Sequence, residues 1–151
     1  MARHPRWVRA FLSDADLEAV GAAIASAEAA TSAEVRVHLD ASCPGDAMTR
    51  AVEVFERLGM QRTAERHGVL IYVSIEDHKL AVIGDRGIDE RVGQAYWERL
   101  VETALGHFRQ ARAREGLVHA VGEVGSALRR HFPRRPDDVN ELPDQVSIEP
   151  S

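Results

Sequence analysis

The residues best suited to chemistry in this chain lie at the two ends of a predicted β-hairpin. The segment from Gly68 to Gly87 reads GVLIYVSIEDHKLAVIGDRG and holds two apolar runs separated by Glu76-Asp77-His78. Runs of β-branched and aromatic residues bounded by turn formers predict two antiparallel strands that are buried on both faces. Charged groups are therefore concentrated at the ends of the hairpin, where a ligand could reach them.

One end of the hairpin collects carboxylates and arginines. The polar residues that the predicted topology brings there are Glu34, Arg66, His67, Asp85, Arg86 and Asp89. Carboxylate oxygens suit a hard cation such as Mg²⁺ or Ca²⁺, and guanidinium groups suit bidentate contact with phosphate. Glu34, Asp85 and Asp89 are the predicted metal ligands. Arg66 and Arg86 are the predicted anion-binding residues.

A simpler interpretation of this end competes with the site. Asp85 and Arg86 would form only a salt-bridged turn, and Asp89 would only stabilise the first turn of its helix. The opposite end, with Asp40 and the hairpin turn from Glu76 to His78, is a second candidate location. It is most simply a polar turn, but ligands of open α/β sheets often bind beyond the carboxyl ends of parallel strands.

Motifs of known enzyme classes are missing from the sequence. It contains no P-loop, G-x-S-x-G, H-E-x-x-H or dinucleotide fingerprint, and no two histidines lie at i, i+4 on a predicted helix. Cys43 is the single cysteine, which excludes an intrachain disulfide. It lies in a loop, and a nucleophilic role would need an activating neighbour; His38 is the nearest histidine in sequence.

Composition narrows the class of protein. The chain has 151 residues, of which 44% are hydrophobic and 28% charged, with a net charge of −5. These values are typical of one globular domain and argue against general binding of a nucleic-acid backbone. No apolar run approaches the length that crosses a membrane. We expect a cytoplasmic protein without nucleic-acid partners or membrane insertion, monomeric or weakly oligomeric, whose partner is another protein.

The elements that must position these residues follow from apolar periodicity. A helix is predicted over Asp14–Ala30, where Ser13 and Asp16 resemble a capping box. Clean alternation over Glu34–Asp40 predicts a strand with one polar face near a sheet edge. A second helix is predicted over Asp46–Gly59. Its predicted buried residues are Met48, Val52, Phe55 and Leu58.

Helical patterns follow the hairpin. The last helix is predicted over Gly116–His131, where Gly122 and Gly125 would cost helix propensity unless another element packs closely there. Residues 133–151 are rich in Pro, Asp and Glu, and we predict that this acidic tail lacks regular secondary structure. The apolar residues with which the tail could dock on the body are Val139, Leu142, Val146 and Ile148.

The order of the elements is helix, strand, helix, strand, strand, helix, helix. A crossover helix makes the first two strands parallel, and the hairpin makes the third antiparallel. We therefore predict an α/β fold, a three-layer α/β/α sandwich with a small mixed sheet and helices on both faces. Residues 1–132 would form this domain and residues 133–151 the tail.

The chain resembles the TPM domain family. The resemblance rests on TSAEVRVHL (Thr31–Leu39), ERLGMQRTAERHGVLIYVSIEDHKLAVIGDRGI (Glu56–Ile88) and the acidic ending DDVNELPDQ (Asp137–Gln145), which is similar to short soluble bacterial members. It implies the same small sandwich and a divalent-cation site, and acid phosphatase activity has been attributed to a thylakoid-lumen member. The family motif residues at the first polar end are Thr63, Arg66, Gly68, Asp85 and Gly87.

Two departures from the family bear on function. Many members are exported or carry a membrane helix, and we expect neither feature in this chain. The usual Gly-aromatic-Gly after the third strand is here Gly84-Asp85-Arg86-Gly87. One hypothesis is a domain that binds a divalent cation or acts as a protein-interaction module. The alternative is a metal-dependent acid phosphatase acting on phosphate monoesters, with Arg86 steadying the phosphate oxygens. The lack of a convincing nucleophile or acid–base pair favours the binding module.

Overall fold

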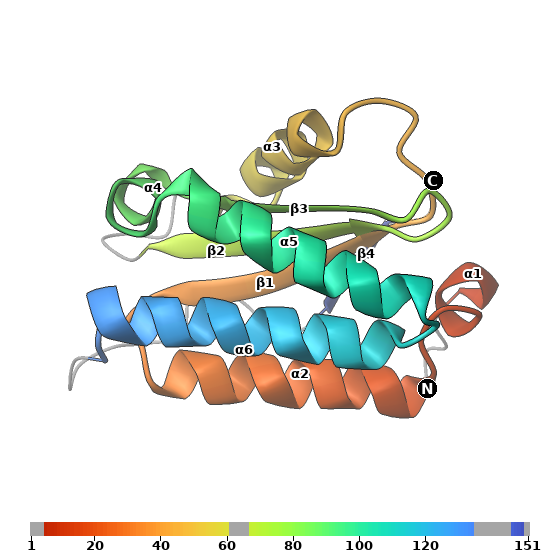
Figure 1. The fold of residues 1–151 in the computed structure, drawn as a ribbon, viewed down its shortest axis with the longest axis horizontal. Helices are drawn as coiled ribbons and strands as arrows, with labels where there is room; N and C mark the ends of the chain where they lie inside the picture. The colour runs from red at the N-terminus through yellow and green to blue at the C-terminus, as the bar shows by residue number, and fades with distance from the viewer. Residues whose placement is uncertain (1–4, 61–66, 135–145, 150–151) are drawn as a thin grey trace.

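A four-stranded mixed sheet runs through the middle of the molecule, with helices on both faces (Figure 1). The computed structural model describes residues 5–60, 67–134 and 146–149. The strands, in the order β3-β2-β1-β4 across the sheet, are β3 (Lys79–Gly84), β2 (Gly68–Ser74), β1 (Glu34–Asp40) and β4 (Val146–Glu149). β1 pairs in parallel with β2 and β4, and β3 pairs antiparallel with β2. The predicted mixed sheet and α/β/α sandwich are confirmed.

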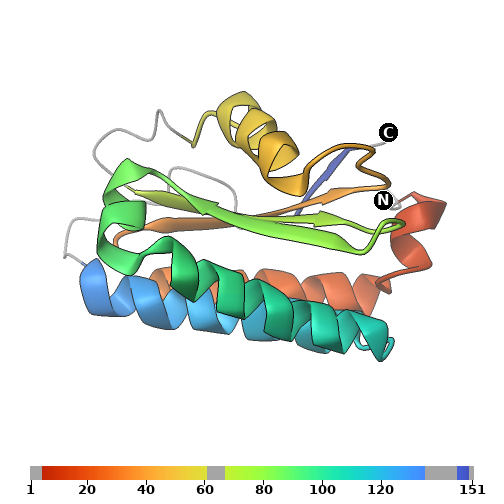
Figure 2. The same ribbon diagram turned by 45° about the horizontal axis from the view of Figure 1, so that its top comes forward.

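The two faces of the sheet are covered unequally, as Figure 2 shows. One face carries three long helices: α2 (Asp14–Ala29), α5 (Gln94–Arg109) and α6 (Ala113–His131). Within the described residues, the other face carries α3 (Ala47–Arg57) alone. Two short helices lie at the ends of the sheet: α1 (Arg6–Arg9) and α4 (Arg86–Val92). Each face has its own apolar cluster, because the central strands direct alternate side chains to opposite sides.

Local sequence signals explain where several helices begin. Ser13 and Asp16 form the reciprocal capping box at the start of α2, and the Asp46 carboxylate accepts a hydrogen bond from the Thr49 amide at the start of α3. A positive φ of 72° at Gly59 follows α3. These predicted signals are confirmed, because they depend only on neighbouring residues.

The predicted buried face of α3 is partly wrong. Phe55 is buried, but Val52 is 38% exposed, and Ala51 and Val54 face the sheet in its place. The small Ala51 lets the helix lie close to Leu70 and Tyr72, with which it shares an apolar cluster. The buried face of α3 is therefore shifted by about one residue from the face that apolar spacing predicts.

Two predictions about the sheet edge are wrong for one shared reason. β1 is an internal strand, because residues 146–149 form β4 beside it, although the whole tail was expected to lack regular structure. Val146 and Ile148 alternate along β4 and pack against the main core. Residues 135–145, with Val139 and Leu142, lie outside the described residues. The polar residues of β1 are therefore enclosed: Glu34 is 0% exposed, and His38 and Asp40 are each 1% exposed.

The helical region after the hairpin contains one more helix than predicted. Gly93, with a φ of 89°, separates α4 from α5. In α6, a Cβ added to Gly125 would lie 2.8 Å from the Cβ of Ala27, so α2 packs closely against this glycine. A Cβ added to Gly122 would have no atom within 4 Å, so close packing does not account for that glycine.

Candidate functional site

Asp85, the centre of the first predicted site, has a structural role. Its carboxylate accepts hydrogen bonds from the backbone amides of Gly68, at 2.9 Å, and Ile88, at 3.0 Å. The Nδ1 atom of His67 lies 3.0 Å from the same carboxylate. Asp85 is thus the N-cap of α4 and also joins that helix to the start of β2.

The other residues predicted at this end are spread over different environments. Glu34 is fully enclosed at the start of β1. Arg86 is exposed, and its Nε donates to Glu90 at 3.2 Å. Asp89 lies one turn after Asp85 in an exposed part of α4, and Arg66 lies outside the described residues.

The surroundings shift the pKa of one carboxylate at this end. Desolvation of its carboxylate, and to a lesser extent the negative charge of Asp85, raise the pKa of Asp89. Among the residues that the structure describes, no three His, Cys, Asp or Glu side chains gather in a way that could hold one metal ion. The predicted metal and anion site stays a prediction.

The opposite end of the sheet contains a chain of buried polar contacts. The Asp40 carboxylate accepts hydrogen bonds from the Tyr72 hydroxyl at 2.6 Å and from the Arg50 Nε at 2.8 Å. Its other oxygen lies 3.1 Å from the His38 Nε2, and the His38 Nδ1 lies 2.8 Å from the Ser147 hydroxyl. These contacts run from β4 through β1 to α3, so they connect the tail with the body of the protein.

The charges in this chain are complementary. Burial alone would raise the pKa of Asp40, but hydrogen bonds from Arg50, Tyr72 and His38 outweigh it, and the pKa of Asp40 is lowered. Hydrogen bonding to Asp40 raises the pKa of Arg50, and burial together with that carboxylate raises the pKa of Tyr72. Asp40 therefore remains a carboxylate and Tyr72 a neutral phenol at neutral pH, which suits a stable structural contact.

A cavity of about 420 Å³ lies beside these contacts, under the loop before α3. Cys43 in this loop is 3% exposed, and its thiol donates to the Gly45 carbonyl oxygen at 3.5 Å. Its backbone amide donates to the Asp77 carboxylate. The Lys79 Nζ donates to the carbonyl oxygens of Cys43, at 2.7 Å, and Gly45, at 2.8 Å. These bonds fix the loop, and both ring nitrogens of His38 lie against other partners, Asp40 and Ser147.

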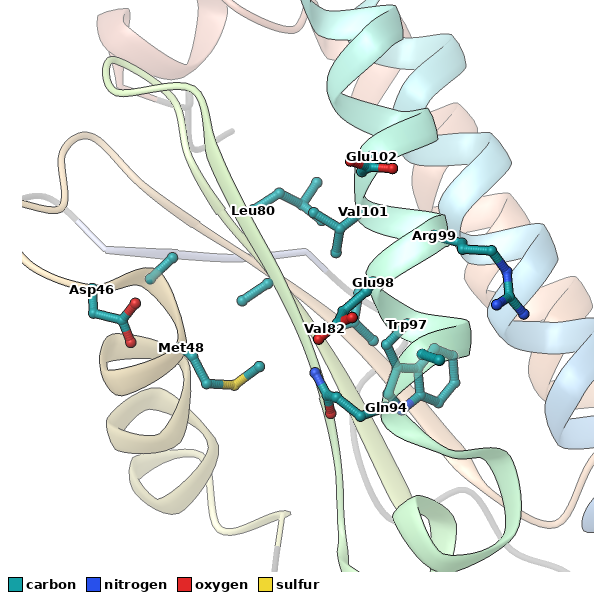
Figure 3. Close-up of a pocket in the computed structure, with 13 residues that line it drawn as sticks. Asp46, Met48, Leu80, Val82, Gln94, Trp97, Glu98, Arg99, Val101 and Glu102 are labelled. Atoms are coloured by element: carbon teal, nitrogen blue, oxygen red, sulfur yellow. The ribbon is translucent and has the colours of Figure 1, made fainter.

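A larger hollow lies on the β3 side of the sheet (Figure 3). It has a volume of about 630 Å³ and runs between α3 and α5 over β3, and we name it the β3 groove. The residues that line it are Asp46, Ala47, Met48, Leu80, Ala81, Val82, Gln94, Ala95, Trp97, Glu98, Arg99, Val101 and Glu102. Its floor is apolar, and its upper walls carry charged side chains.

Sequence reasoning missed the β3 groove. Leu80 and Val82 were predicted to be buried strand residues, which they are at 7% and 1% exposure. The available signal was Val101, an apolar residue on a helix face adjoining the predicted core, which remains partly exposed at the groove. An apolar residue in that position belongs either to the core or to a binding surface, and only the packing of α3 and α5 decides between them.

No helix in the described part of the chain combines the length and apolar character needed to cross a bilayer.

Comparison with known proteins shows which of them share this sequence and fold. A comparison with curated proteins finds no match.

Solved structures do match. The BA42 protein of the psychrophilic bacterium Bizionia argentinensis is 37% identical, with 92% of this chain and 96% of that chain covered and a TM-score of 0.83. The N-terminal domain of a P. gingivalis protein matches at 17% identity, covering 83% of this chain and 82% of that one, with a TM-score of 0.69. The N-terminal domain of the cg2496 protein of Corynebacterium glutamicum matches at 16% identity, covering 85% and 86%, with a TM-score of 0.61. The last two are similar in fold alone.

A family model provides the most extensive evidence from sequence. The model of the TPM domain matches residues 8–127, which include every described element from α2 to α5 and most of α6. The match agrees with the identity to BA42 over nearly the whole length of both chains. This chain belongs to the TPM domain family.

Proposed function

We propose that the protein is a binding module that accepts a segment of another protein in the β3 groove. The observation that carries the proposal is the groove itself, a hollow of about 630 Å³ with an apolar floor along an edge strand. Ligand sites are typically concave, mostly apolar and bordered by a few polar groups. The β3 groove has these properties, with Leu80, Val82 and Val101 lining it and Glu98 and Glu102 beside them.

The polar contacts at the ends of the sheet support binding over catalysis. Asp85 caps a helix, and Asp40 accepts hydrogen bonds from three side chains. The Tyr72 hydroxyl and the Cys43 thiol donate to oxygen atoms of the protein. A nucleophile needs a neighbouring base that takes up its proton, and these contacts use the available acceptors for structure.

Selection of peptides tests the proposed module. Random peptides displayed on phage are selected on the intact protein, and enriched sequences are then measured against two variants. Val101→Glu places a charge in the groove, while Val52→Glu is the matched control, since Val52 is an exposed valine on α3 that does not line the groove. Enriched peptides should bind the wild type and the control but not Val101→Glu. Equal binding to all three proteins, or no enrichment, would contradict the module.

A divalent cation is the second candidate ligand, supported by the first polar end. Asp85 and Asp89 lie one helical turn apart, and the pKa of Asp89 is raised in part by the Asp85 charge. A bound Mg²⁺ or Ca²⁺ would relieve that repulsion. Glu34 would have to reach the ion from inside the fold, and Arg66 and Arg86 would hold an accompanying anion.

An NMR titration with Mg²⁺ and Ca²⁺ tests the cation proposal. Shifts should concentrate at residues 85–89 and disappear in Asp89→Asn. Asp14→Asn is the matched control, an exposed aspartate in the first turn of α2. An assay with phosphate monoesters then tests the alternative of a metal-dependent acid phosphatase: cation-dependent hydrolysis lost in Asp89→Asn would favour it, while shifts without hydrolysis favour the binding module.

A further inference from the structure

We infer that the ligand of the β3 groove is an extended peptide that adds a strand beside β3 and carries Lys or Arg next to an apolar side chain. This inference rests on the proposed function and specifies the class of partner. It follows from the open edge of the sheet, the direction of the backbone groups there, the space between the helices and the charge of the groove.

The two edges of the sheet differ in what covers them. On the β1 side the chain supplies its own edge strand, since Val146–Glu149 pairs in parallel with Val37–Asp40. On the opposite side β3 is the last strand in the described part of the sheet. An edge strand with free backbone groups is a template for pairing with another extended chain.

The pairing of β3 with β2 decides which backbone groups point outward. The Asp85 amide donates to the Gly68 carbonyl oxygen at 3.0 Å, which makes this pair a hydrogen-bonded one. In antiparallel strands hydrogen-bonded pairs alternate with pairs whose N–H and C=O groups point away from each other. With the observed register, Ile83 and Ala81 direct these groups to β2. Leu80 and Val82 therefore direct theirs to the free edge.

The helices beside β3 leave room for such a strand. α3 and α5 pack on opposite faces of the sheet, and in Figure 3 the side chains of Met48 and Gln94 point toward β3 from the two sides. Val82 is only 1% exposed, so neighbouring side chains must move before an added strand can pair with it. Met48 and Gln94 are long and unbranched, and a change of rotamer moves them without moving either helix. The groove volume of about 630 Å³ then accepts apolar side chains from an added strand.

The charge of the groove selects the peptide. Asp46 on one wall and Glu98 and Glu102 on the other are exposed carboxylates. The guanidinium of Arg99 points toward α6 and away from the groove (Figure 3). The ammonium of Lys79 donates to two carbonyl oxygens of the loop before α3. An acidic groove attracts a basic peptide and repels an acidic one, which excludes the DDVNELPDQ segment of a second copy of this chain.

Three synthetic peptides test the inference on the intact protein. The first alternates apolar residues with Lys and Arg, the second replaces every basic residue with Glu, and the third is the first peptide with alternate backbone amides methylated. Affinity is measured by fluorescence anisotropy, and the position of binding by NMR on ¹⁵N-labelled protein. The basic peptide should bind and shift the resonances of Met48, Leu80 and Val101.

The other peptides should bind at least about tenfold more weakly, because one meets like charge and the other cannot donate to β3. Glu98→Gln combined with Glu102→Gln should weaken the basic peptide several-fold, whereas Glu18→Gln, an exposed carboxylate on α2, should not. Equal affinity of the acidic peptide would overturn the charge requirement, and equal affinity of the methylated one would overturn strand addition. Both results would leave the module standing. If neither these peptides nor selected ones bind, the module fails as well.

Discussion

The two edges of the sheet show opposite solutions to the same problem. At the β1 edge, β4 pairs with the strand, and Ser147 begins a chain of polar contacts through His38 to Asp40. At the β3 edge, Leu80 and Val82 direct backbone groups into an apolar groove. This fold therefore already adds one strand to its sheet from its own tail, and Ser147, His38 and Asp40 connect that strand with the body.

The largest expected effect on stability lies at the β1 edge, which β4 covers. Asp40→Asn should lower the free energy of unfolding by about 3 kcal/mol, because an amide would direct N–H groups at donors that now point to a buried carboxylate. Urea denaturation measures this loss, with the exposed Asp14→Asn as control. A loss no larger than that of the control would show that the hydrogen bonds of Asp40 contribute nothing to stability.

Acid should reveal the same contribution in the wild type. The pKa of Asp40 is lowered in the folded protein, so its stabilisation is fully present above the unfolded value of about 3.9 and is lost as the pH falls through the folded pKa. Urea denaturation of the wild type and Asp40→Asn from neutral pH downward should give a gap that narrows below about pH 4. A constant gap would mean that Asp40 does not titrate with the predicted sign.

The sequence predicts features that depend on neighbouring residues and misses features that depend on contacts between distant segments. The hairpin strands and the capping box of Ser13 and Asp16 were predicted correctly, because their patterns lie within a few residues. β4 was missed because two apolar residues, Val146 and Ile148, are too weak a pattern by themselves. That strand forms on the edge of β1, more than a hundred residues earlier in the sequence.

The candidate site shows the same limit. The position of Asp85 directly after a strand was predicted correctly, and its role as a metal ligand stays a prediction. Its contacts with the amides of Gly68 and Ile88 depend on how β2, β3 and α4 meet. The β3 groove was missed because no motif marks it. It exists because α3 and α5 stand apart over an edge strand, which is a property of packing.

Removing β4 should have an intermediate effect. A chain that ends after residue 145 loses the partly buried side chains of Val146 and Ile148, and it should be about 2 kcal/mol less stable. Ser147→Ala, which removes only the hydroxyl beside His38, should cost about 1 kcal/mol. Urea denaturation of the wild type, the truncated protein and Ser147→Ala checks both values. An unchanged truncated protein would show that the β1 edge needs no cover.

The charged residues beside the unpaired β3 edge should contribute least to stability. Glu98→Gln combined with Glu102→Gln should change the free energy of unfolding by less than about 0.5 kcal/mol, since both side chains are exposed on α5. The same urea denaturation that detects Asp40→Asn serves here. A large loss of stability would make these carboxylates structural and would remove the contrast between the edges.

Hydrogen exchange at β3 tests the central claim most directly. In the free protein the Leu80 amide should exchange at least roughly tenfold faster than the Ala81 amide, because only Ala81 is bonded to β2. Saturation with the basic peptide should slow Leu80 to a rate near that of Ala81, as expected when a strand pairs with the free edge. Equal protection of the two amides in the free protein, or a Leu80 rate that the bound peptide leaves unchanged, would contradict an open edge that binds by strand addition.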